Sequence, residues 1–139
     1  RFVVDASVAA QWLLPEADSA RALALISTSI ERIVPDLLYA EIGNILWKRV
    51  RTGSLLQSQA KQALDELAGI PMRVCPVAEI MELGLAIAIE YDRSFYDSAY
   101  LALAIREGAT LLTADARLLR ALENTPMSAA MRHIADMVI

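Results

Sequence analysis

Short apolar runs alternate with longer segments of helical hydrophobic spacing along this chain. The apolar runs span only a few residues and end at turn-forming positions, which is typical of buried strands. The expected strands are residues 2–4, 32–34, 72–75, 109–113 and 131–138. The expected helices are residues 8–14, 18–30, 36–51, 57–68, 78–90 and 95–107, with a further short helix opened by 113–115. This alternation predicts an α/β fold, a three-layer α/β/α sandwich with a short, mainly parallel central sheet.

Length and composition favour a single domain over residues 1–139. A chain of 139 residues has the size of one domain, and its 56% of hydrophobic residues with only 5 glycines and 5 prolines argues against disorder. The longest apolar runs, 83–89 and 98–105, are far shorter than the roughly 20 residues that cross a bilayer. We therefore expect no transmembrane segment and no membrane partner.

Cysteine content bears on the redox compartment of the protein, and net charge bears on its ability to bind nucleic acid. Cys75 is the single cysteine, so it forms no internal disulfide and has no second cysteine with which to bind zinc. This usage favours a reducing cytoplasm. The 13 basic and 17 acidic side chains give a net charge of −4, which argues against broad electrostatic attraction to nucleic acid. A nucleic-acid partner would have to meet a local basic patch or bound cations.

Two aspartates stand where an expected strand passes into an expected helix. Asp5 follows the first apolar run, and Asp115 follows the run at 109–113. Both should lie at the carboxyl edge of a parallel sheet, where α/β proteins bind ligands. The alternative interpretation of each aspartate alone is a helix N-cap, a position that aspartate favours.

Two further acidic residues lie within expected helices. Glu41 borders the apolar stripe of the helix expected at 36–51. Asp97 lies in the first turn of the helix expected at 95–107, on its inward side. A boundary glutamate packing its stem on the core, and an aspartate favoured by the helix N-terminus, are the alternatives. Four carboxylates gathered at one sheet edge would repel one another, so they call for hard divalent cations such as Mg²⁺ or Mn²⁺. Two such ions hydrolyse phosphodiesters by activating water and stabilising the leaving oxygen.

Four stretches of the sequence carry a resemblance to a known family. They are Val3–Ser7, Tyr39–Leu46, Tyr96–Ala104 and Leu111–Asp115, in this order and over nearly the whole chain. With them the chain resembles PIN-domain ribonucleases, and more closely the VapC toxins of bacterial and archaeal toxin–antitoxin pairs.

The resemblance implies four catalytic carboxylates that bind the metal and three polar side chains that support them. The implied metal-binding and catalytic residues are Asp5, Glu41, Asp97 and Asp115. The supporting residues are Ser7, Asn44 and Thr113. Turn and capping chemistry is the alternative role for the two hydroxyls. Some relatives carry another acidic residue where this chain has Arg117, so the resemblance implies one or two bound ions.

A cluster of basic residues at the end of the third expected helix is the best candidate for holding RNA phosphates. The candidates are Lys48, Arg49, Arg51 and, more distant in sequence, Arg93. A solvated helix terminus stabilised by the helix dipole is the alternative. Trp12 and Trp47 stand among aliphatic residues at helical spacing, so we expect them in the core or at an interface rather than stacked on bases.

These features together favour a Mg²⁺- or Mn²⁺-dependent endoribonuclease that cuts RNA phosphodiesters by metal-activated water, the toxin of a VapBC-type pair. The resemblance implies an RNA substrate, a VapB-like antitoxin, a homodimer, a toxin–antitoxin hetero-oligomer, and operator DNA bound only through the antitoxin. The alternative is a catalytically silent PIN-like module that binds nucleic acid or a partner. A haloacid-dehalogenase-like phosphatase fits poorly, because its first motif has a second aspartate where this chain has Ser7.

Overall fold

Five short strands form one sheet in the computed structural model, which describes residues 1–16 and 18–137. The strands are β1 (Phe2–Val4), β2 (Arg32–Pro35), β3 (Arg73–Cys75), β4 (Thr110–Thr113) and β5 (Met131–His133). Their order across the sheet is β3-β2-β1-β4-β5, and every neighbouring pair is parallel. The α/β fold is thus confirmed, with a sheet that is parallel throughout rather than mainly parallel. The central strand β1 has β2 on one side and β4 on the other.

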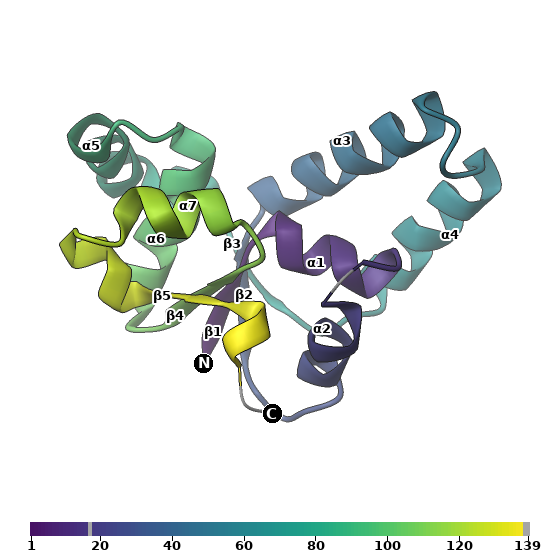
Figure 1. Ribbon diagram of the computed structural model, residues 1–139, viewed down its shortest axis with the longest axis horizontal. Helices are drawn as coiled ribbons and strands as arrows, with labels where there is room; N and C mark the ends of the chain where they lie inside the picture. Colours follow the sequence, from purple (N-terminus) through teal and green to yellow (C-terminus); the bar gives the residue numbers. More distant parts are fainter. Residues whose placement is uncertain (17, 138–139) are drawn as a thin grey trace.

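Helices cover both faces of this sheet. They are α1 (Ala6–Leu13), α2 (Ser19–Ile26), α3 (Leu37–Arg51), α4 (Gln57–Ala68), α5 (Met81–Tyr91), α6 (Phe95–Glu107) and α7 (Ala116–Leu122). Short 3₁₀ turns occupy Val77–Ile80, Pro126–Ala130 and Ile134–Asp136. Figure 1 shows α1 and α2 on one side of the sheet and α5 and α6 on the other, with α3 and α4 forming a hairpin that projects away. None of the helices described here has the length and apolarity needed to span a membrane.

Helix α6 contains a long uninterrupted run of buried residues. Every residue from 98 to 104 is buried, and the helix packs against β1, β2 and β4. Its ends are set locally, since the Ser94 hydroxyl accepts a hydrogen bond from the Asp97 amide and Gly108 closes the helix at a φ of +61°. The position of α6 above the central strands brings its first turn close to the carboxyl edge of the sheet.

Several elements end earlier than the sequence pattern predicts. Helix α2 ends at Ile26 instead of residue 30, because Ser27 and Thr28 bond the carbonyls of its last turn with their own hydroxyls. The buried Arg32 side chain then bonds the carbonyl of Leu25, together with carbonyls of the loop that follows. The helix predicted at 78–90 begins as a 3₁₀ turn and becomes α-helical only at Met81.

The C-terminal segment is also shorter in strand than predicted. Strand β5 ends at His133, whose Nδ1 accepts a hydrogen bond from the amide of Ala135 and starts a 3₁₀ turn. The far end of the predicted strand, Val138, lies outside the described residues.

The two tryptophans differ in environment. Trp12 belongs to the core, as predicted, and its indole N–H donates to the carbonyl of Ala22. Trp47 is 54% exposed, so it does not lie in the core, and of the two predicted environments only an interface with another molecule stays open for it. Trp47 belongs to α3, which with α4 forms the hairpin that projects away from the sheet (Figure 1).

Candidate active site

The junction between β1 and α1 holds a buried carboxylate. Asp5 is the N-cap of α1, and its Oδ1 accepts hydrogen bonds from the amide of Val8 (3.1 Å) and the hydroxyl of Ser7 (2.5 Å). The side chain is only 7% exposed, and this burial raises its pKa from 3.8 to about 6. Capping and a candidate site role therefore coexist in one residue.

The junction between β4 and α7 repeats this construction. Asp115 is the N-cap of α7 and accepts hydrogen bonds from the amides of Arg117 (2.9 Å) and Leu118 (3.2 Å). The buried hydroxyl of Thr113 accepts from the Asp115 amide at 3.0 Å. Asp115 itself is exposed to solvent.

Two predicted hydroxyls connect these junctions. The Ser7 Oγ accepts a hydrogen bond from the Ala114 amide at 2.9 Å and lies 3.3 Å from the Oγ1 of Thr113. Because Ser7 also donates to Asp5, the ends of β1 and β4 are held together by side chains as well as by strand pairing. Ser7 and Thr113 thus position the two turns that carry Asp5 and Asp115.

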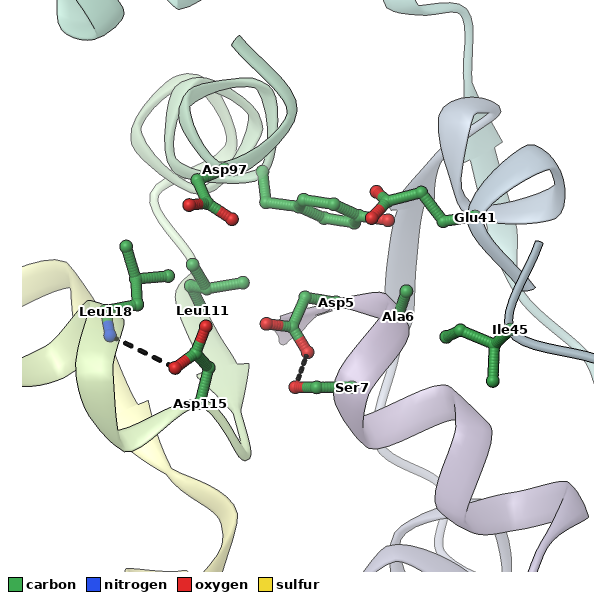
Figure 2. A pocket seen from close by; sticks show the side chains of 10 residues that line it. Asp5, Ala6, Ser7, Glu41, Ile45, Asp97, Leu111, Asp115 and Leu118 are labelled. Atoms are coloured by element: carbon green, nitrogen blue, oxygen red, sulfur yellow. Dashed lines mark hydrogen bonds between the residues drawn. The ribbon is translucent and has the colours of Figure 1, made fainter. Parts of the chain in front are cut away.

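The remaining two carboxylates come from helices above the sheet edge. A cavity of about 190 Å³ is lined by all four predicted carboxylates, with Ser7 and Tyr100 among the other lining residues. Figure 2 shows Asp5, Asp97 and Asp115 directed toward a common space, which Glu41 enters from α3. Burial raises the pKa of Asp97, an effect that the positive charge of Arg93 opposes. Four segments far apart in sequence thus supply one acidic cavity.

Tyr100 is a member of this cavity that the sequence analysis missed. It lies one turn beyond Asp97 on α6 and is only 3% exposed. Its hydroxyl and the Oε1 of Glu41 are both buried, and neither makes a hydrogen bond of good geometry among the described residues, although the two groups lie close enough to shift each other's pKa. Burial raises the pKa of Glu41 and of Tyr100, and the charge of Glu41 adds to the rise for Tyr100. A polar hydroxyl three residues after Asp97, on the same helical face, was the available sequence signal.

Replacing Tyr100 with phenylalanine tests this unpaired state. Because a buried hydroxyl without a partner costs free energy, Tyr100→Phe should raise the free energy of unfolding by about 1 kcal/mol. Urea denaturation of both proteins in EDTA measures the difference. If the free energy of unfolding instead falls by a similar amount, the Tyr100 hydroxyl forms a hydrogen bond with Glu41 in solution.

The residues of the predicted basic cluster do not form one patch but make different contacts. Arg49 forms an ion pair with Glu16, and the guanidinium of Arg51 stacks over Trp47 at 4.8 Å from the ring centroid. Both guanidinium groups therefore already have partners within the protein. An exposed ion pair of this kind contributes little to stability.

The other polar candidates lie nearer the acidic cavity. Lys48 and Asn44 line a neighbouring cavity that also touches Glu41. Arg93 precedes α6, and its buried Nε has no hydrogen-bond partner in the part of the chain that the structure describes. Asn44 thus stands beside the acidic cavity rather than within it.

The acidic cavity has the donor chemistry of a hard divalent cation. All its polar ligand atoms are oxygens, one buried carboxylate oxygen of Glu41 is unpaired, and burial raises the pKa of Asp5, Glu41 and Asp97. A bound cation would favour the charged forms of these groups. In residues 1–16 and 18–137, no three such side chains are already close enough to hold one ion together. The residue types therefore fit Mg²⁺ or Mn²⁺, and binding would have to draw the side chains inward.

Comparisons with known proteins agree with this construction. The model of the PIN domain family matches residues 2–123. The chain is 37% identical over 120 residues to Ribonuclease VapC3 of Pyrobaculum aerophilum, covering 85% of this chain and 92% of that protein. It is 33% identical over 117 residues to Ribonuclease VapC1 of Mycobacterium tuberculosis, covering 84% and 86% of the two chains.

Solved structures share the fold over almost the whole chain. The crystal structure of PAE2754 from Pyrobaculum aerophilum matches with a TM-score of 0.68 and 25% identity, covering 97% of this chain and 84% of that one. The structure of VapBC2 from Rickettsia felis bound to a DNA fragment from their promoter matches with a TM-score of 0.68 and 15% identity, covering 95% and 97%. With the matched family model, the identity to two ribonucleases and the cavity of four carboxylates, this chain belongs to the PIN-domain family and, within it, to the VapC-type ribonucleases.

Proposed function

We propose that this chain is an Mg²⁺- or Mn²⁺-dependent endoribonuclease and the toxin of a toxin–antitoxin pair. The observation that carries the proposal is the convergence of Asp5, Glu41, Asp97 and Asp115 on one cavity. These four come from the ends of two neighbouring strands and from two helices above them. Membership in the VapC-type ribonucleases supports RNA as the substrate.

The four carboxylates would hold one or two divalent cations. A bound cation supplies Lewis-acid chemistry at a phosphodiester and compensates the negative charges that would otherwise repel RNA. The protein's part is positional: hydrogen bonds from Ser7 and the Val8 amide fix the Asp5 carboxylate, and those from Arg117 and Leu118 fix Asp115. Because all four donors belong to the first turns of α1 and α7, their geometry is preset by the fold.

Asp97 and Glu41 are less constrained than Asp5 and Asp115. Asp97 extends from the first turn of α6, and the Oε1 of Glu41 has no hydrogen-bond partner in the described part of the chain. These are the side chains that can move toward a cation with the smallest loss of existing hydrogen bonds. Arg93, which lowers the pKa of Asp97, provides a positive charge near the place where a phosphate would approach.

Cleavage of RNA with and without divalent metal tests the proposal. End-labelled transfer RNA and ribosomal RNA are incubated with the purified protein in Mg²⁺ or Mn²⁺, beside a reaction in EDTA. We expect discrete products with either metal and none in EDTA. If no RNA is cut and calorimetric titration detects no metal binding, the silent-module alternative replaces the enzyme.

We also propose an antitoxin partner that binds near the acidic cavity, a homodimer of this chain and larger toxin–antitoxin oligomers that contact operator DNA through the antitoxin. The fold shared with the VapBC2 structure supports the antitoxin and the DNA. Apolar side chains exposed on α5, among them Leu85 and the 74% exposed Ile89, support a second copy of the chain. Light scattering of the purified chain tests the dimer.

The single buried Cys75 suits a reducing cytoplasm.

A further inference from the structure

A second cavity opens directly beside the acidic one. It measures about 460 Å³, lies between α3 and the start of α6, and shares Glu41 and Ile45 with the cavity of the four carboxylates. Its size falls in the range of small-molecule and nucleotide sites. Glu41 and Ile45 border both cavities, so a ligand in the second cavity would lie next to the carboxylates.

Its lining follows one face of α3. Glu41, Asn44, Ile45 and Lys48 occur at spacings of three and four residues, so they form one stripe along the helix. Tyr96 faces this stripe from the first turn of α6 and is 58% exposed. From the acidic cavity outward, the stripe passes from a carboxylate to an amide and then to an ammonium group.

Each of these side chains offers a different contact to a nucleotide. An exposed tyrosine ring is a stacking surface for a base of any sequence. The Asn44 amide has both a donor and an acceptor, so it can pair with the edge of a base. Lys48 is exposed and forms no ion pair within residues 1–16 and 18–137, so its charge is available to a phosphate.

We propose that this second cavity binds the unpaired base of the nucleotide next to the phosphate that is cut, and so sets the sequence preference of cleavage. Tyr96 stacks on the base, Asn44 reads its edge, and Lys48 holds the next phosphate outward. The proposal rests on the ribonuclease function. The occupant is single-stranded RNA, because only a base turned out of a duplex can reach a side-chain amide and an aromatic face together.

The order of charges along this cavity matches an RNA strand. The lining carries one carboxylate, at the end shared with the candidate metal site, and one ammonium group at the other end. An RNA strand would place one phosphate over the metal side and the next toward Lys48. An antitoxin segment is the competing occupant, and the experiment distinguishes it.

Cut-site sequencing on a randomised single-stranded RNA library is the test. We expect Asn44→Ala to reduce the discrimination among bases at one position beside the cut by roughly tenfold, because it removes the edge contact. Tyr96→Ala should lower kcat/KM on all sequences by roughly tenfold through lost stacking, and Tyr96→Phe should restore it. Tyr39→Ala is the matched control, since Tyr39 is an exposed tyrosine of α3 outside both cavities. It should cleave with the wild-type rate and preference.

A binding measurement separates this inference from the ribonuclease function itself. Fluorescence anisotropy with a labelled single-stranded RNA of mixed sequence is measured in the Asp97→Asn background with Mg²⁺ present. Weaker binding by roughly tenfold on adding Tyr96→Ala, but not Tyr39→Ala, supports the base site even if the wild type cuts nothing and the ribonuclease proposal fails.

Two outcomes would overturn the inference. In the first, the wild type cuts RNA while Asn44→Ala and Tyr96→Ala keep its rate, preference and RNA affinity within twofold. In the second, these variants keep all RNA properties but lose inhibition by an antitoxin that inhibits the wild type, which would assign the cavity to the protein partner.

Discussion

Asp97→Asn should lower the rate of RNA cleavage by roughly 10³-fold. The substitution keeps the size of the side chain and removes one of the four charges that would hold the cation. Loss of a charge at a metal site of this kind removes several kcal/mol of transition-state stabilisation, and about 1.4 kcal/mol corresponds to a factor of ten. The measurement is the single-turnover rate on a cleaved RNA in Mg²⁺, with product separated by denaturing electrophoresis.

The fold should survive this substitution. Burial raises the pKa of Asp97, which means that the folded protein disfavours its charge, so a neutral asparagine should leave the free energy of unfolding in EDTA unchanged or higher. Thermal unfolding in EDTA checks this. Loss of cleavage with an unfolded variant would say nothing about metal, whereas cleavage at the wild-type rate by a folded Asp97→Asn protein would remove Asp97 from the site.

Asp92→Asn is the matched control for this experiment. Asp92 lies five residues before Asp97 but is exposed and does not line the acidic cavity. It has a positive φ of 53°, a left-handed conformation that asparagine adopts readily. This variant should therefore fold and cut RNA as the wild type does, which separates a general loss of acidic charge from the loss of a carboxylate in the cavity.

The free energy of unfolding of the wild type, taken relative to that of Asp5→Asn, should fall by about 2 kcal/mol between pH 4.5 and pH 7.5. The pKa of Asp5 rises from 3.8 to about 6 on folding, mainly because the carboxylate is buried. The folded state therefore holds more protons than the unfolded state between these two values, and its stability falls as the pH rises through this window. Asparagine stays neutral and retains an oxygen that can accept from Ser7 and Val8, so the variant avoids the fall.

Urea denaturation of both proteins in EDTA at the two pH values measures this effect. The stability advantage of Asp5→Asn over the wild type should be larger at pH 7.5. Other groups that titrate on folding, such as Glu107, whose pKa Arg73 lowers to about 2, are present in both proteins and cancel in the difference. An advantage that is equal at both pH values, or larger at pH 4.5, would contradict the raised pKa of Asp5.

The sequence was most informative where structure depends on neighbouring residues. The predicted bounds of α4 and α6 agree with the structure. For α6 the reason is local, because Ser94 caps its N-terminus and Gly108 caps its C-terminus. The same local rules placed Asp5 and Asp115 within two residues of a strand end, where both cap a following helix.

Local rules were least informative about side chains whose partners lie far away in the chain. Arg49 and Lys48 are adjacent in sequence, yet one pairs with Glu16 and the other borders a cavity with Tyr96. Trp47 has the spacing of a core residue but belongs to a hairpin that projects beyond the core. The burial of each side chain depends on which elements pack against its helix, and no pattern within one helix contains that information.

The sequence by itself determined the α/β alternation, the residues at the strand ends and the four carboxylates with oxygen-ligand chemistry. Tertiary structure alone decided that β1 pairs with both β2 and β4, which brings Asp5 and Asp115 to one edge, and that α3 and α6 add Glu41 and Asp97 above it. It also decided that the buried hydroxyl of Tyr100 faces this cavity without a partner. The physical reason is range: capping and periodicity act within a few residues, whereas strand order and helix packing minimise exposed apolar surface across the whole chain.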